Sequence, residues 1–174
     1  MKKFLLLLIC TALFLSAAGC AMGGEPQKEQ ATPSKSETNT QKTQTFGLNE
    51  SAVFSDLKFT ATELTQSEGK DFFVPEKGNV FVGVKFTVEN ISDKEQSISS
   101  VLLFEPYVDD VKANLSISAN CAFDEGTLDG SIAPGKKLVG WYAIEVPENW
   151  KTIEMDVQAD LWSNKSATFV FHNK

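Results

Sequence analysis

The segment from Asn79 to Asn90, NVFVGVKFTVEN, carries an apolar side chain at every second position. In an extended strand a period of two places alternate residues on opposite faces, so this apolar set shares one face. A strand with one apolar face is typical of an antiparallel sheet that covers a core on one side. The pattern therefore predicts a long, half-buried antiparallel strand. Its inward set is Val80, Val82, Val84, Phe86 and Val88, and its outward set is Phe81, Gly83, Lys85, Thr87 and Glu89.

The same period recurs in several other segments, and turn-forming residues lie between them. Pro134-Gly135 suits a type II turn, because proline presets the first φ angle and glycine accepts the positive second one. Asn164-Lys165 suits a tight hairpin. We find no helical period, so many short strands separated by turns predict an all-β, antiparallel β-sandwich of about seven or eight strands. The other alternating segments are 57–61, 142–146, 153–161 and 167–171.

The first residues of the chain have the layout of an export signal. Two lysines precede an apolar run from Phe4 to Ala18, which is shorter than the roughly 20 residues that a membrane-spanning helix needs. Small residues then lead directly to Cys20, and this junction resembles a bacterial lipobox, although leucine is commoner where Ala17 stands. The resemblance implies a lipoprotein signal peptide over residues 1–19 and a lipidated Cys20, whose acyl chains hold the protein on the outer face of the cell membrane. The alternative is a plain signal peptide with an incidental cysteine.

Residues 21–45 differ in composition from everything around them. They include no aromatic and no branched aliphatic residue, and their three lysines balance three glutamates. Such a segment cannot bury enough apolar surface to fold. We therefore expect three parts: a signal peptide over residues 1–19, the lipidated cysteine with a disordered linker over 20–45, and the sandwich domain over 46–174.

The charged residues and cysteines exclude some classes of function. The 174 residues carry a formal net charge of −7 and no arginine, the residue that most often contacts phosphate and guanine, so we expect no nucleic-acid partner. Cys10 and Cys20 belong to the amino-terminal segment. Cys121 therefore stands alone in the domain, where we expect no intrachain disulfide and a small side chain packed among apolar neighbours.

Three short motifs occur in an order that resembles a known family. They are the strand and turn from Gly78 to Lys94, the turn Ala133-Pro134-Gly135, and the strand end from Ile144 to Pro147. Together they resemble the uncharacterised immunoglobulin-like domain of many Gram-positive surface lipoproteins. That domain is related in fold to a small secreted mycobacterial antigen. The resemblance covers most of residues 46–172 and implies an immunoglobulin-like sandwich, but the family has no agreed activity to transfer.

Catalytic and metal-binding patterns are weak in this sequence. The single histidine, His172, is the third residue from the end of the sequence, and Cys121 has no second histidine to activate it. The acidic stretch DEGTLDG, with Asp124, Glu125 and Asp129, lacks the spacing of a calcium loop. We therefore expect no catalytic residue, no metal and no cofactor, and a protein that is not an enzyme.

Aromatic residues supply the remaining candidates for a functional surface. Phe81, Trp141 and Trp162 face away from the core set of their own strands, and Phe72 and Phe73 fall in a loop. Exposed aromatic side chains often mark binding surfaces for proteins or sugars. The alternative is that these side chains fill the rims of the sandwich or lie beneath loops.

These observations favour a membrane-anchored, extracytoplasmic lipoprotein with a non-catalytic binding domain. The expected partners are the membrane, through lipidated Cys20, and a cell-surface protein or wall polymer. Two alternatives stay open. One is an enzyme or enzyme subunit that acts on the cell wall through a pair of carboxylates. The other is a structural spacer or envelope stress lipoprotein.

Overall fold

The computed structural model describes residues 44–159 and 165–173. The predicted signal peptide, Cys20 and almost all of the linker lie outside the described residues, as do Trp162 and the first residue of the Asn164-Lys165 hairpin. Eleven strands and two short helices make up the described part. In chain order they are β1 (Thr45–Phe46), β2 (Ser51–Val53), β3 (Leu57–Ser67), β4 (Asn79–Asn90), β5 (Gln96–Ile98), α1 (Ser100–Leu103), β6 (Phe104–Val108), β7 (Val111–Lys112), α2 (Ile117–Cys121), β8 (Gly130–Ile132), β9 (Lys137–Pro147), β10 (Thr152–Gln158) and β11 (Ser166–His172).

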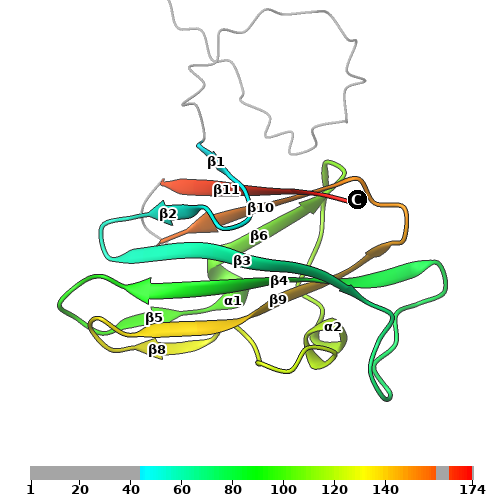
Figure 1. Ribbon diagram of the computed structural model, residues 1–174, viewed down its shortest axis with the longest axis horizontal. Helices are drawn as coiled ribbons and strands as arrows, with labels where there is room; N and C mark the ends of the chain where they lie inside the picture. Colours follow the sequence, from blue (N-terminus) through cyan, green and yellow to red (C-terminus); the bar gives the residue numbers. More distant parts are fainter. Residues whose placement is uncertain (1–43, 160–164, 174) are drawn as a thin grey trace, which may run out of the picture. The chain divides into compact units, whose positions relative to one another are not determined.

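The strands form two main sheets and a small one (Figure 1). One main sheet has the order β1-β11-β10-β6-β7, the other has the order β2-β3-β4-β9, and β5 pairs with β8 alone. Every strand pair is antiparallel except β1 with β11. The predicted antiparallel β-sandwich is confirmed. Five of the additional strands, β1, β2, β5, β7 and β8, are two or three residues long, too short to show a period of two in the sequence. The sixth, β6, has five residues and does alternate, but it directly follows the apolar residues of α1.

Aromatic rings join the two main sheets through a shared core. Phe86 on β4 meets Phe169 on β11 and Phe104 on β6, each with 5.2 Å between ring centroids. The inward set predicted for β4 is buried throughout, and so are the inward residues predicted over 57–61 on β3 and 142–146 on β9. The predicted register is therefore correct at Phe86. Every second residue of each strand points toward the opposite sheet, so side chains from both sheets fill one core.

Two of the turns expected from the sequence have the local geometry that their residues predict. The Asn90 side chain is buried, donates to the carbonyls of Lys94 and Ile132, and accepts from the Ser92 N–H. The Lys136 N–H donates to the Ala133 carbonyl across a turn in which Gly135 has a φ of 69°. These motifs of the family resemblance therefore serve the fold.

The two helices are a difference from the sequence-based expectation of strands alone. The helix α1 has four residues and α2 has five, so neither completes the two turns over which a period of 3.6 becomes visible. Within the described ranges, no helix is long and apolar enough to cross a membrane. The helix α2 bears on function, because it begins the segment that covers one edge of a main sheet.

Candidate functional site

Residues 116–129, here called the strap, run along the free edge of β9 and contain α2 (Figure 1). The Ser116 N–H donates to the Ala143 carbonyl, and the Trp141 N–H donates to the Gly126 carbonyl, both at 2.9 Å. The Asn120 side chain accepts from the Ala143 N–H at 2.8 Å. These bonds satisfy backbone groups that point away from β4. The strap therefore closes the edge of the sheet over this stretch.

The strap also buries two aromatic side chains that the sequence predicted to lie at the surface. Phe81 and Trp141 do leave the main core, as their parity predicts, but their side chains are 0% and 5% exposed. Phe81 packs with Ala119, Ala143 and Phe123 in a second, smaller core beneath the strap. The expectation that Phe81 and Trp141 form an exposed binding surface is wrong, because a segment from another part of the chain covers them.

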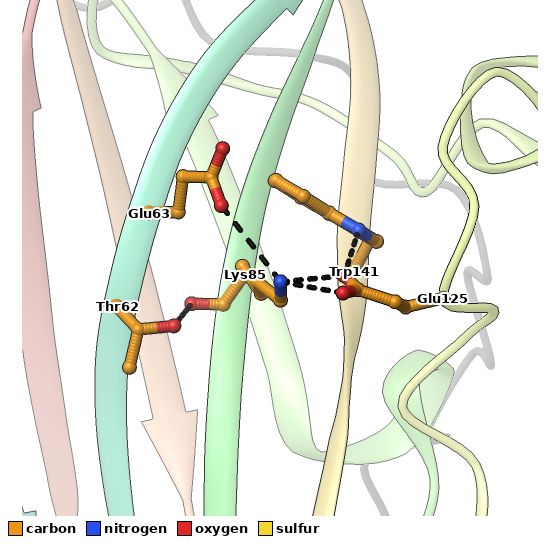
Figure 2. A network of polar contacts seen from close by, with 5 residues as sticks. All are labelled: Thr62, Glu63, Lys85, Glu125 and Trp141. Carbon is orange, nitrogen blue, oxygen red and sulfur yellow. Dashed lines mark hydrogen bonds and ion pairs between the residues drawn. The ribbon is translucent and has the colours of Figure 1, made fainter.

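Trp141 is held by polar contacts as well as by packing (Figure 2). Its indole N–H donates to Glu125 Oε2 at 2.9 Å, and Glu125 Oε1 lies 2.7 Å from the Lys85 ammonium. That ammonium also stands 5.4 Å from the Trp141 ring centroid and 3.8 Å from a Glu63 carboxylate oxygen. The hydrogen bond to Glu125 raises the pKa of Lys85 above its ordinary value. Through Glu125, these contacts hold the strap against β4 and β9.

Close packing on the outer face of β4 and β9 supports the same conclusion. The Phe123 ring stacks on Trp141 with 4.8 Å between centroids and lies directly over Gly83. A β-carbon at position 83 would stand 2.7 Å from the Phe123 ring. Glycine in a strand interior often marks such a close approach. The strap is therefore fitted to the sheet beneath it.

The acidic stretch divides its carboxylates among separate partners. Asp124 pairs with Lys70, Glu125 with Lys85, and Asp129 accepts from the N–H and hydroxyl of Ser100 at 2.9 and 2.8 Å. Across residues 44–159 and 165–173, no group of three or more His, Cys, Asp or Glu side chains is placed to hold a metal ion. These carboxylates tie the strap to the rest of the domain.

The two residues considered as catalytic nucleophile or base end different elements of the fold. His172 ends β11, where its ring nitrogen lies 3.4 Å from the Thr152 hydroxyl. Cys121 ends α2 and is exposed. The expectation of a packed Cys121 is wrong, because Ala119 and Asn120 occupy the buried side of this short helix. No contact joins Cys121 to a base among the described residues.

The loop between β3 and β4 carries the other two predicted aromatics and extends away from the sheets (Figure 1). We call residues 70–74 the aromatic tip. Lys70 and Phe73 exchange two backbone hydrogen bonds of 2.8 and 2.9 Å around Asp71 and Phe72. Phe72 is 96% exposed, Phe73 40% and Val74 62%. The structure therefore places Phe72 and Phe73 at the surface, while their role in binding stays a prediction.

Two residues constrain the backbone of the aromatic tip. Asp71 adopts a positive φ of 56°, which Asp tolerates, and Gly69 adopts a φ of 108°. A β-carbon on Gly69 would stand 2.4 Å from the Phe73 carbonyl oxygen, so no other residue fits there. The Lys70 ammonium pairs with Asp124 and joins the tip to the strap. The exposed rings are thus presented on an ordered support.

The sequence did not indicate a groove that lies between α1 and α2. It has a volume of about 480 Å³ and includes three strongly exposed apolar side chains, Val101, Leu102 and Ile117. Tyr142 also lines it, and burial raises the pKa of Tyr142 to about 12. The apolar run VLLF at residues 101–104 was the available signal. It has no period because it spans the end of a helix and the start of a strand.

The chain from residue 46 to residue 168 matches a domain of unknown function, DUF4352. The chain belongs to this family. The match covers most of the described sandwich and confirms the family resemblance expected from the strand and turn motifs. No curated protein is significantly similar to the chain.

Several solved structures share the fold of the DUF4352 domain. A candidate lipoprotein, ycdA from Bacillus subtilis, has a TM-score of 0.57 at 15% identity; the match covers 70% of this chain and 38% of that protein's chain. An uncharacterised β-sandwich protein from Clostridium difficile has a TM-score of 0.52 at 16% identity, over 86% of this chain and 100% of that one. The secreted protein MPT63 from Mycobacterium tuberculosis has a TM-score of 0.51 at 13% identity, over 74% and 96% of the two chains. At these identities the likeness establishes the fold alone.

Proposed function

We propose that the protein is a membrane-anchored, extracytoplasmic lipoprotein whose DUF4352 domain acts by contact with a partner in the cell envelope, without catalysis. The observation that carries this proposal is the aromatic tip. Two phenylalanines and a valine stand exposed in a row on an ordered turn. Apolar side chains that are grouped together and exposed to solvent often mark an interaction surface.

The hydrogen bonds of the acidic side chains favour a binding role over a catalytic one. In the part of the chain that the structure describes, the acidic residues of the strap bond to lysines and to a serine. Glu145 accepts hydrogen bonds from the Glu76 N–H and from the Asn79 side-chain amide. Asp109 accepts hydrogen bonds from the backbone N–H groups of Lys151 and Thr152, where β10 begins. Carboxylates committed to such bonds stabilise loops. A glycosidase directs two carboxylates at one space. Asp109, Asp110 and Glu154 do line one pocket, but Asp109 is already bonded there to the Lys151 and Thr152 N–H groups.

The location and partner rest on the amino-terminal segment together with the relatives. The Ala-Ala-Gly-Cys junction after an apolar run favours lipidation at Cys20. A candidate lipoprotein and a secreted protein share the fold, which agrees with a place outside the cytoplasm. The partners expected from the sequence, a cell-surface protein or a wall polymer, are the ones that a binding assay tests first.

The test is a pair of binding assays on cell extracts and on purified wall, with Phe72→Ser and Phe73→Ala compared with wild type. We expect both variants to lose binding and to melt close to the wild-type temperature, because the tip packs little against the core. Val111→Ser is the control, since Val111 is exposed on the short strand β7. Normal binding by both tip variants would overturn the assignment of the tip and direct attention to the strap at residues 124–129.

A further inference from the structure

The aromatic tip has the shape and chemistry of a membrane-inserting loop. Phe72, Phe73 and Val74 are consecutive, exposed and apolar, and the loop that carries them extends beyond the sheets (Figure 1). Ligand sites for small molecules are concave, whereas this one projects. We propose that the partner of the tip is the lipid bilayer surface, into which Phe72 and Phe73 insert. This inference rests on the proposed function, which assigns contact to the tip, and it names the membrane in place of a surface protein or wall polymer as what the tip meets.

The size of the tip favours a bilayer over a protein partner. A phenylalanine buries on the order of 150–250 Å² of surface, so two rings and a valine provide a few hundred. A stable protein interface of standard size needs about 800 Å² from each partner. A bilayer accepts a small projecting apolar group without a complementary pocket, because its hydrocarbon region is continuous. The tip is therefore large enough for insertion and small for a stable protein complex.

The local order of the tip also suits insertion. The Lys70–Phe73 hydrogen bonds, the positive φ of Asp71 and the constraint at Gly69 hold both rings outward before any contact is made. Binding groups that are already ordered lose less conformational entropy on association. If the chain is also anchored to the membrane, the tip has a high effective concentration at the bilayer surface. Even a weak affinity of the tip for lipid then leaves it inserted for much of the time.

The charges around the tip predict which lipid it prefers. Glu68, Asp71 and Glu76 outnumber Lys70 and Lys77 near the tip, and the whole chain has a net charge of −7. Anionic lipid would repel this region, whereas zwitterionic lipid would not. Insertion is therefore driven by the apolar side chains. We expect it to be stronger on phosphatidylcholine vesicles than on vesicles rich in phosphatidylglycerol.

The experiment places a fluorophore at the tip by the substitution Phe72→Trp, with Val111→Trp as the matched control on the exposed strand β7. Each full chain is held on phosphatidylcholine vesicles by its lipidated Cys20 or by an amino-terminal histidine tag on a nickel-chelating lipid, so the result does not depend on the native anchor. Vesicles with brominated acyl chains then quench any tryptophan that enters the hydrocarbon. The wild-type signal is subtracted to remove the native tryptophans.

We expect brominated lipid to quench the added fluorescence of Phe72→Trp at least twofold more than that of Val111→Trp. Equal quenching of the two would overturn the bilayer as partner. If quenching is equal and Phe72→Ser still abolishes binding to a protein or wall fraction, the inference fails and the proposed function stands. If quenching is equal and Phe72→Ser binds the protein and wall fractions as well as wild type does, both fail.

Discussion

Phe72 and Phe86 are the same residue type at opposite extremes of exposure. Phe86 is fully buried and meets rings from the opposite sheet, whereas Phe72 is almost fully exposed at the aromatic tip. The difference comes from the backbone around them. Phe86 belongs to the inward set of a long strand, and Phe72 lies in a two-residue turn whose hydrogen bonds are completed by its neighbours. One side chain therefore stabilises the fold, and the other is available for contact.

Truncating each ring tests this contrast. We expect Phe86→Ala to lower the free energy of unfolding by about 3–5 kcal/mol, because it removes buried surface and leaves a cavity between the sheets. Phe72→Ala should change it by no more than about 0.5 kcal/mol, as an exposed residue without packing partners would. Urea denaturation of both variants measures the difference. Similar losses at the two positions would show that the tip packs against the domain.

At the scale of elements, the strap is what the sequence could not reveal. The period of two correctly predicted that Phe81 and Trp141 leave the main core, since parity depends only on neighbouring residues. What covers them depends on residues far along the chain, such as Phe123 over Gly83. The strap has neither helical nor strand period, so no local signal marked it. The loop at Phe72 and Phe73 was predictable because it interrupts a clear pair of strands.

Substitution of Gly83 tests how closely the strap fits the sheet. We expect Gly83→Ala to lower the free energy of unfolding by about 1–3 kcal/mol, because the new β-carbon overlaps the Phe123 ring and must displace it. The control is Gly47→Ala, where the nearest atom lies 3.7 Å from the added carbon. Thermal melts with tryptophan fluorescence follow both the fold and the surroundings of Trp141. A Gly83→Ala variant as stable as Gly47→Ala would contradict this close fit.

At the scale of the whole molecule, the chain combines a sandwich of known family with an amino-terminal segment of different composition. The family match begins at residue 46, where the polar stretch over residues 21–45 ends. The sequence therefore allowed the sandwich to be predicted from strand period and turn chemistry. The anchor at Cys20 comes from a junction of four residues and stays a prediction, as do the boundaries of the signal peptide and the linker.

The anchor prediction concerns where the full chain is found. We expect Cys20→Ser to shift the protein from the membrane fraction to the medium or to an uncleaved precursor, because serine cannot form the thioether that carries the lipid. Cell fractionation with an antibody against the domain gives the distribution. A mature-sized Cys20→Ser protein that remains in the membrane fraction would show that another feature holds it there.

The bonds between the strap and β9 have a consequence for many copies crowded together. An open strand edge offers unpaired N–H and carbonyl groups to any neighbouring chain, and such edges initiate aggregation. In this domain the Trp141 and Ala143 N–H groups are already bonded to the strap. Loosening the strap would expose these groups together with the buried Trp141 and Phe81 rings. The strap therefore removes one stretch of open edge through which crowded copies of the domain would otherwise pair edge to edge.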